Sequence, residues 1–338
     1  MVVDVRAVAS SLDELLTGAG ERKPFVNPDG RSSASFEHVW IDGVPHVVKY
    51  LHLDHDFTMR VSGDLRCRIV RAWEAGLLDS AADLIDHAIV GAATGWGRNG
   101  WGAALLMRDV SADLLPPGDA PIPADQHAAF LDHLAGFCAA TWGWRDAPGS
   151  GPALLPYDAR WAWFGRLALE GERHLGWPER VPKLAEEGWR RFEQRAPADV
   201  ARLVDELRGE VTPLAAALRE TPSCLLHGDV KASNTGRGPD GRTVLIDWAY
   251  VGEGPACHEL AWHLALDRSR LPMSKEATAD AFRAALERHG VGTAAWWDRQ
   301  LSLCLLGAVV QFGWEKALGD ADELDWWCRA ARQGAAWL

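Results

Sequence analysis

Short apolar runs in the first third of the chain predict β-strands. Residues 36–41 and 46–50 are rich in aromatic and β-branched side chains, and the Asp-Gly pair between them is a strong hairpin signal. Residues 89–91 and 103–107 form a second pair of apolar runs on either side of a glycine-rich turn. The pattern therefore predicts a small antiparallel sheet.

From about residue 124 the pattern becomes helical, with apolar side chains recurring every three or four residues and with Gly and Pro between the segments. Four prolines between positions 116 and 123 mark a linker. We therefore expect a first lobe over residues 1–112 and a second, helical lobe over residues 113–338. Helices are expected at residues 65–77 of the first lobe and, in the second lobe, at residues 125–142, 181–195, 199–219, 275–289 and 293–318.

A polar loop lies between two apolar strands near position 230. Residues 224–226 lead into Asp229 of a His-Gly-Asp sequence, and Asn234 follows five positions later. A Gly-Pro-Asp-Gly turn then returns the chain, so that Asp247, after the second strand, lies beside Asn234. Phosphoryl transfer needs one carboxylate near the attacking hydroxyl and oxygen ligands for Mg²⁺ near the phosphates. This segment supplies both, and we predict that it is the catalytic centre.

The sequence His-Gly-Asp-x-x-x-x-Asn followed by Ile-Asp-Trp resembles the aminoglycoside phosphotransferase and choline kinase-like family, which are small-molecule relatives of protein kinases. The resemblance implies an α+β, protein-kinase-like fold with two lobes, a small β-rich one and a larger helical one. It also implies that Asp229 is the catalytic base and that Asn234 and Asp247 bind Mg²⁺. Lys231 either contacts the transferred phosphate or is an ordinary exposed lysine.

The first lobe contains candidates for nucleotide binding. Lys49, at the end of the second strand, matches the family's lysine that binds the α- and β-phosphates. Ser32 and Ser33 would lie in the loop above the phosphates, which departs from a glycine-rich pattern. An acid on the following helix should orient Lys49, and we expect Asp64, with Glu74 as the alternative.

Residues after the fourth strand resemble the family's hinge. There the backbone C=O of Arg108 and the backbone N–H of Val110 are candidates for pairing with the adenine edge. The pattern fits ATP or GTP as the phosphate donor, and ATP is our prediction.

Two other motifs are excluded by their context. A Gly-x-Gly-x-x-Gly sequence at residues 95–100 is followed by a strand, whereas a dinucleotide site needs a helix there. His258 and His263 are five positions apart, whereas a zinc protease needs a spacing of four. Glu259 replaces the Asp with which the family opens this helix, which leaves its supporting role open.

Composition narrows the class of partners. The formal net charge of −12 argues against a nucleic-acid ligand and mildly favours a cationic or neutral substrate. The six cysteines show no metal-ligand spacing, and no apolar stretch of membrane-spanning length occurs, so we expect a soluble, cytoplasmic protein. Most of the 18 tryptophans should be core residues, and a few could line a substrate pocket. No motif specifies an oligomeric state.

The length of one segment selects among kinase-like functions. A protein kinase holds its peptide with an activation segment, but only 11 residues separate Asp247 from Glu259. A small-molecule hydroxyl is therefore the expected acceptor, such as that of an aminoglycoside or another amine-bearing metabolite, with a neutral sugar as an alternative. A pseudokinase without transfer activity is the second alternative, although the base, the metal ligands and Lys49 are all present.

Overall fold

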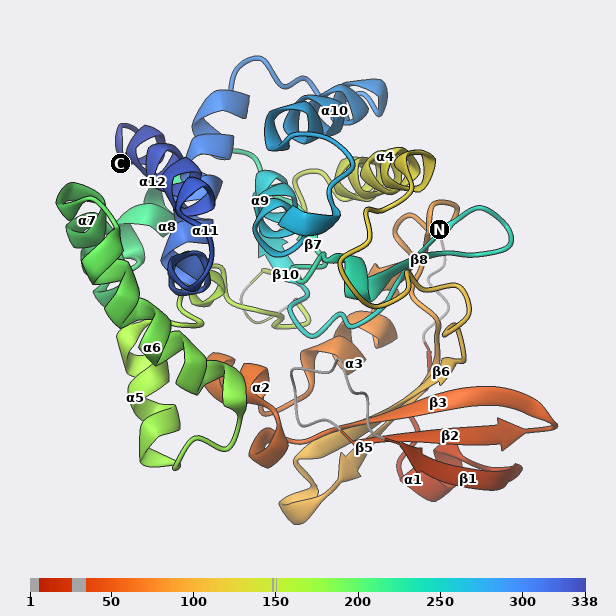
Figure 1. Ribbon diagram of the computed structural model, residues 1–338. Coiled ribbons are helices and arrows are strands. Elements are labelled where there is room, and N and C mark those ends of the chain that lie inside the picture. Colours follow the sequence, from red (N-terminus) through yellow and green to blue (C-terminus); the bar gives the residue numbers. More distant parts are fainter. Residues whose placement is uncertain (1–5, 26–34, 148, 150) are drawn as a thin grey trace.

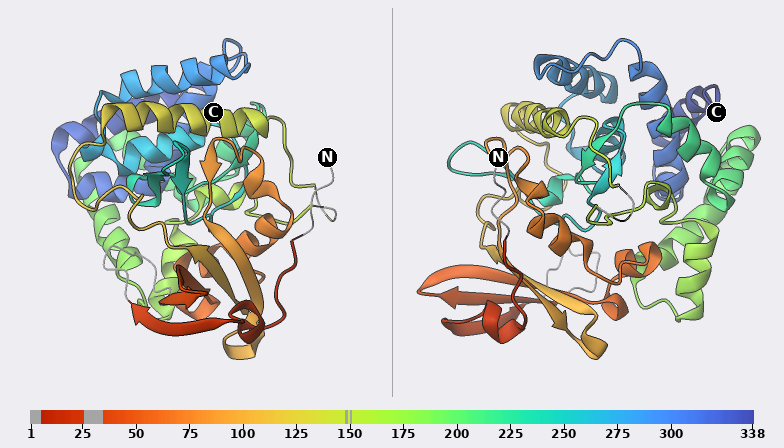
Figure 2. Two further views of the ribbon diagram at one scale, coloured as in Figure 1. Left: turned by 90° about the vertical axis from the view of Figure 1, so that its right-hand side faces the viewer. Right: turned by 180° about the vertical axis from the view of Figure 1, so that it is seen from behind.

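A computed structural model describes residues 6–25, 35–147, 149 and 151–338. The chain forms a β-rich N-terminal lobe and a larger helical lobe (Figure 1), which confirms the predicted two-lobe α+β fold. The five-stranded sheet lies at the bottom and α10 at the top in every view (Figure 2). Ser32 and Ser33, the predicted phosphate-loop residues, lie outside the described residues.

The N-terminal lobe is built on an antiparallel sheet with strand order β1-β2-β3-β6-β5. Both predicted hairpins are confirmed. Asp42 and Gly43 have φ values of 50° and 78°, which is the left-handed pair that a two-residue hairpin turn requires. The strands are β1 (Ala19–Phe25), β2 (Ser35–Ile41), β3 (Val44–Leu51), β5 (Ile89–Trp96) and β6 (Gly102–Arg108).

Three short helices pack beside this sheet: α1 (Leu12–Leu15), α2 (Phe57–Ser62) and α3 (Arg68–Glu74). The helix predicted over residues 65–77 is thus shorter than expected. It ends at Glu74, two residues before Gly76, whose φ of 67° is incompatible with continuing a right-handed helix.

The second lobe is mainly helical, as predicted, but the single helix expected over residues 199–219 is wrong. The chain breaks between Gly209 and Thr212, and Pro213 occupies the first turn of the next helix, where its missing N–H is tolerated. The helices are α4 (Ala124–Ala140), α5 (Arg166–His174), α6 (Arg180–Arg195), α7 (Ala198–Gly209), α8 (Thr212–Arg219), α9 (Cys257–Leu266), α10 (Lys275–Arg288), α11 (Trp297–Leu318) and α12 (Ala321–Ala335).

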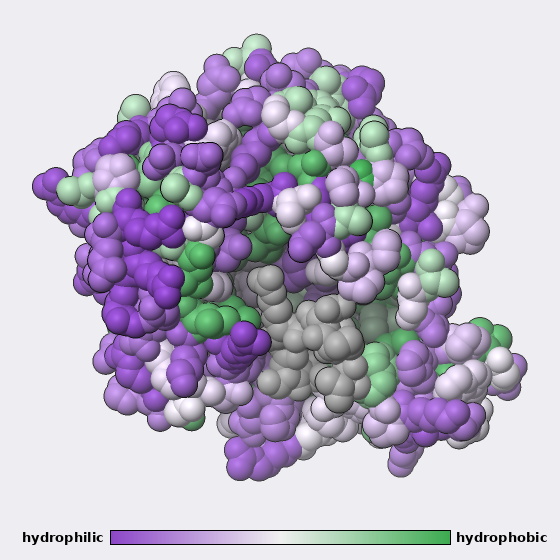
Figure 3. Space-filling model, viewed as in Figure 1, coloured by the Kyte–Doolittle hydropathy of each residue, from purple (hydrophilic) through white to green (hydrophobic). Residues whose placement is uncertain are grey.

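The core of this lobe surrounds α11. By length and composition α11 could cross a membrane, yet 78% of its most apolar window is buried, as expected for a core helix. Most tryptophans are buried as predicted, and Trp161, Trp163, Trp248 and Trp327 are among the largest fully buried side chains. The face in Figure 3 is mostly hydrophilic, with apolar side chains scattered among polar ones.

Two small sheets carry the segment that the sequence predicts to be catalytic. In one, β7 (Cys224–Leu226) pairs with β10 (Gly252–Gly254), and in the other the strand order is β4-β9-β8. The predicted Gly-Pro-Asp-Gly hairpin joins β8 (Thr235–Arg237) to β9 (Thr243–Leu245). The strand β4 (Ile85–Asp86) comes from the first 112 residues but pairs in parallel with β9. This strand ties the two lobes together.

Candidate active site

The two small sheets bring the catalytic loop together as the sequence predicts. The buried strand β7 delivers the chain to His227, and the β8–β9 hairpin returns it, so that the Ile246 N–H donates to the Asn234 carbonyl at 3.0 Å. His227 is buried, and its Nε2 lies 2.9 Å from the Ile246 carbonyl. Burial lowers the pKa of His227 to about 4, so this imidazole is a neutral bridge between the two halves of the site.

Only glycine can occupy position 228. Its φ of 84° lies in the left-handed region, and an added Cβ would stand 2.6 Å from both Arg160 Nη1 and the Tyr250 carbonyl. The His-Gly-Asp sequence therefore has glycine at its centre because no side chain fits there.

The Asp229 carboxylate is buried and holds three donors. Its Oδ1 accepts from Trp262 Nε1 at 3.0 Å, and its Oδ2 accepts from Lys231 Nζ at 2.6 Å and from Asn234 Nδ2 at 2.9 Å. Burial raises the pKa of Asp229, and the Lys231 ammonium only partly offsets this effect. Lys231, proposed from sequence as a phosphate contact or an exposed lysine, is in this structure a partner of Asp229.

Lys49 on β3 reaches across to the second lobe. Its buried Nζ lies 2.7 Å from Asp247 Oδ1. Burial lowers the pKa of Lys49, but the Asp247 carboxylate outweighs burial and the net shift is upward. Asp247 has a φ of 66°, unusual for a residue other than glycine, and its side chain is 31% exposed. The Asp247 carboxylate is therefore only partly covered by the protein.

The expected partnership between Asp64 and Lys49 is wrong. The Asp64 carboxylate accepts the Arg68 backbone N–H at 3.0 and 3.1 Å and pairs with the Arg68 guanidinium at 3.3 Å. Glu74, the alternative, is exposed on α3. Asp64 precedes α3 closely enough for its carboxylate to satisfy the open N–H of Arg68 in the first turn, which keeps it away from Lys49.

Asp56 is an acid near Lys49 that the sequence analysis missed. It is buried, it caps α2 by accepting the Met59 N–H at 3.0 Å, and its charge contributes to raising the pKa of Lys49. The detectable signal was an Asp directly before a helical run, a typical N-cap, seven residues after the lysine.

The predicted hinge residues lie where β6 leaves the sheet. The Arg108 side chain is directed to Asp86 of β4 with an ion pair, so it stabilises the contact between the lobes. Val110 is buried, and none of the hydrogen bonds between described residues uses its backbone N–H. That open donor is consistent with the predicted role in pairing with a nucleotide base.

Glu259 on α9 holds the catalytic loop by its backbone. Its carboxylate is fully buried and accepts the N–H groups of His227 at 2.6 Å and of Gly228 at 3.1 and 3.2 Å. Burial raises the pKa of Glu259 to about 7. The substitution of Glu for the family's Asp therefore leaves a carboxylate in a supporting role.

We expect Glu259→Ala to lower the free energy of unfolding by about 2 to 4 kcal/mol, because it leaves two buried backbone N–H groups without an acceptor. Urea unfolding measures this as a lower midpoint with an unchanged slope. The matched variant Glu259→Asp keeps the carboxylate, and its free energy of unfolding should fall by less than half as much. Equal losses in the two variants would show that side-chain volume, not the carboxylate, matters here.

Trp262 is a second residue that the sequence analysis missed, because it lies 33 positions from the carboxylate it contacts. Its ring packs edge-on against Phe312, with centroids 4.7 Å apart, and this contact directs the indole N–H toward Asp229. An N–H donor stabilises the ionised form of a carboxylate and so lowers its pKa.

In Trp262→Phe we therefore expect a higher pKa for Asp229. A base acts only when deprotonated, so the acid limb of the pH profile of kcat should move to higher pH, with kcat near pH 7 reduced about tenfold. The phenyl ring retains the contact with Phe312, which limits the effect on stability. A profile that overlays that of the wild type would contradict this role for the indole.

The oxygen atoms at the site suit Mg²⁺ bound to a nucleotide. Mg²⁺ commonly uses one or two protein oxygens and completes its shell with water and phosphate oxygens. Asn234 donates both described hydrogen bonds through Nδ2, which leaves its Oδ1 as an acceptor, and Asp247 Oδ2 is also available. Among the described residues no group of three His, Cys, Asp or Glu side chains could hold a metal, so a dedicated protein cage is not formed there.

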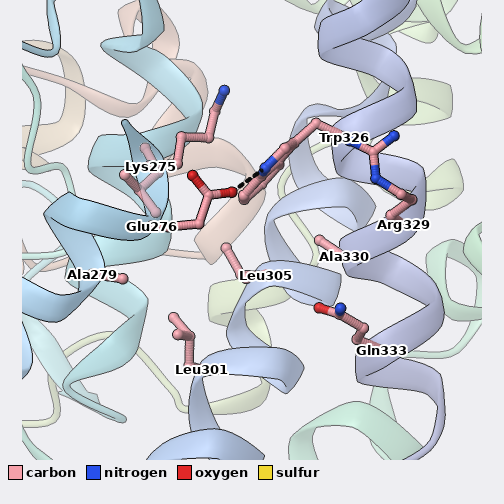
Figure 4. A pocket seen from close by; sticks show the side chains of 10 residues that line it. Lys275, Glu276, Ala279, Leu301, Leu305, Trp326, Arg329, Ala330 and Gln333 are labelled. Atoms are coloured by element: carbon pink, nitrogen blue, oxygen red, sulfur yellow. Dashed lines mark hydrogen bonds between the residues drawn. The ribbon is translucent and has the colours of Figure 1, made fainter. Parts of the chain in front are cut away.

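Two cavities lie apart from these residues. One of about 320 Å³ is enclosed by α9, α10, α11 and α12, where Trp326 Nε1 donates to Glu276 Oε1 at 2.7 Å (Figure 4). The other, of about 590 Å³, lies between α2, α5 and the α7–α8 connection. Neither cavity is lined by a predicted site residue. The candidate site is therefore identified from the hydrogen bonds and charges of its side chains, not from a cavity.

Lys49 of the β-rich lobe faces Asp229 and Asp247 of the helical lobe. This arrangement is typical of a kinase-like phosphotransferase. The sequence pattern of the phosphotransferase enzyme family matches residues 72–296, more than half of the chain, and the protein belongs to this family. No curated protein sequence matches the chain.

The chain is similar to several solved structures, and the first of them supports the kinase-like fold. A microcompartment-associated aminopropanol kinase is 12% identical, with 98% of this chain and 93% of that chain covered and a TM-score of 0.54. The choline kinase LicA from Streptococcus pneumoniae is 11% identical, with 95% of each chain covered and a TM-score of 0.49. An aminoglycoside-3'-phosphotransferase of type VIII is 19% identical, with 87% of this chain and 93% of that chain covered and a TM-score of 0.42.

Proposed function

We propose that this protein transfers the γ-phosphoryl group of ATP to a hydroxyl group of a small molecule. The observation that carries the proposal is that Lys49 of the first lobe meets Asp229, Asn234 and Asp247 of the second. The four residues are linked by bonds of 2.7 to 3.0 Å through Lys49–Asp247, Asn234–Asp229 and the backbone bond between Ile246 and Asn234. A pseudokinase would be expected to lack one of these groups. Bound Mg²⁺ would neutralise charge on the β- and γ-phosphates.

The chemistry assigned to Asp229 follows from its hydrogen bonds. An ionised carboxylate offers about four acceptor positions. Trp262 takes one on Oδ1, whereas Lys231 and Asn234 take both on Oδ2. Oδ1 therefore retains one position for the acceptor hydroxyl. As the hydroxyl oxygen bonds to the γ-phosphorus, the bond to the β,γ-bridging oxygen breaks, the proton passes to Oδ1 and ADP leaves.

Lys49 would bind the α- and β-phosphates. In the structure its ammonium pairs with Asp247, and Asp56 adds a second negative charge nearby. Phosphate oxygens can replace part of that pairing, which would free Asp247 to face the metal ion. Asn234 and Asp247 would then hold Mg²⁺ through their available oxygens.

We infer an acceptor that is small and carries an amine. The chain from Asp247 to the start of α9 at Cys257 forms only the short strand β10, which leaves no segment to hold a peptide. The net charge of −12 favours a cationic molecule. The six cysteines are all free and buried, which suits a reducing cytoplasm.

The test is a coupled ADP-release screen over hydroxylated amines, aminoglycosides and neutral sugars, run in parallel with ATP and GTP. We expect release above background with at least one amine-bearing hydroxyl compound, at a rate that vanishes with the Asp229→Asn protein as the blank. Phosphorylation of neutral sugars alone would overturn the amine inference. Nucleotide binding without ADP release from any acceptor would favour the pseudokinase.

A further inference from the structure

The 3₁₀ turn Ala232–Asn234 carries the metal-ligand candidate Asn234 and begins without a cap of its own. Lys231, which precedes the turn, makes no side-chain capping bond. The open N–H of Ala232 donates instead to Asp267 Oδ2 at 2.8 Å. Asp267 follows directly after α9, so the end of this helix supplies the missing cap from 35 residues away.

Two buried histidines hold Asp267. His263, one turn earlier on α9, has its Nδ1 2.7 Å from the same Oδ2 atom. The other ring nitrogen, Nε2, lies 3.1 Å from Nε2 of His127 on α4. His127 and His263 are almost fully buried, and Asp267 is 5% exposed. The three side chains form one chain of contacts that leads from α4 to the catalytic loop.

The contacts specify where the protons lie. Burial lowers the pKa of His127 to about 4, so this ring is neutral near pH 7. Its Nδ1 has no partner among the described residues, and a buried unpaired acceptor is tolerated better than a buried unpaired N–H. The His127 proton is therefore on Nε2 and is donated to His263. His263 then carries its proton on Nδ1 and donates it to Asp267, whose Oδ2 also accepts the Ala232 N–H.

We propose that His263 and His127 are positioning residues for the catalytic loop: they orient the Asp267 carboxylate that caps Ala232–Asn234 and so place Asn234 beside Asp229. Neither histidine touches the substrate. The kinetic part of the proposal rests on the proposed phosphotransferase function. The structural part, the dependence of the loop on the His263 N–H, does not.

The decisive comparison is between His263→Phe and His263→Asn. Phe fills the space but removes the N–H donor, whereas the Asn amide can place an N–H close to the position of Nδ1. Amide hydrogen exchange of residues 230–235 in the full-length protein should be about tenfold faster in His263→Phe and within about threefold of the wild type in His263→Asn. His289→Phe, directly after α10, is the control for the same substitution away from the loop.

Kinetics provide the second measurement. We expect His263→Phe to lower kcat by about 10 to 100-fold with little change in KM for ATP, because the defect lies in the placement of Asn234 rather than in nucleotide binding. His263→Asn should recover most of kcat, and His127→Phe should show a smaller loss. Wild-type exchange and kcat in His263→Phe, or equal defects in the Phe and Asn variants, would overturn the proposal. An inactive wild type would overturn the proposed function, and amide exchange alone would then decide the role of the histidines.

Discussion

Asp229→Asn should lower kcat by about 10² to 10⁴-fold while ADP binds within a few-fold of the wild-type affinity. The range is that of a general base lost from a reaction whose other groups remain in place. Asparagine also offers one acceptor atom instead of two to the donors Trp262, Lys231 and Asn234, so a small loss of stability accompanies the substitution. Steady-state kinetics and calorimetric titration with ADP measure the two effects separately.

Asp240→Asn provides the matched control. Asp240 lies in the β8–β9 turn between the two halves of the site, its side chain is 49% exposed, and its partner is Arg242. The same chemical change there should leave kcat unchanged. Comparable losses in both variants would show that the hairpin, and not a proton acceptor at position 229, limits the rate.

Asp247→Ala should abolish turnover, because it removes a candidate metal ligand and the partner of Lys49 together. Removal of one member of a largely buried ion pair leaves the other charge uncompensated, so we also expect lower stability. Alanine adds a second effect, since the φ of 66° at this position is unfavourable for it. Turnover is measured across a Mg²⁺ titration, and near-normal rates in the folded variant would exclude the assignment.

Asp247→Asn separates these effects. Asparagine tolerates the left-handed backbone and keeps an oxygen ligand, but it lacks the charge. We expect a higher Mg²⁺ concentration at half-maximal rate and partial recovery of kcat at high Mg²⁺. A rate in Asp247→Asn that is independent of Mg²⁺ would show that the carboxylate acts only through Lys49.

The predicted and observed helices differ where a glycine or proline interrupts an otherwise continuous helical spacing of apolar residues. The apolar spacing over residues 199–219 continues through Gly209 to Pro213, but the backbone breaks there and starts α8 anew. The hairpins were predicted correctly, because Asp-Gly and Gly-Pro-Asp-Gly sequences specify tight turns from within a few residues.

The sequence by itself determined which segment is the candidate catalytic centre. Asp229, Asn234 and Asp247 lie within 19 residues, two short strands and one turn bring them together, and the chemistry of each side chain is evident from its type. The two-lobe order and the strand position of Lys49 were likewise predictable, because both depend on local periodicity and on resemblance to a family.

Only the tertiary structure decided which side chains support that segment. Lys49 contacts Asp247 across 198 positions. Glu259 and Trp262 of α9, and Asp267 directly after it, reach the loop from more than 30 positions away. The same distance in sequence explains the wrong choice of Asp64, whose carboxylate satisfies the nearby N–H of α3. Hydrogen-bond partners of this kind depend on how α9 packs against the loop, and periodicity within a single segment carries no information about that packing.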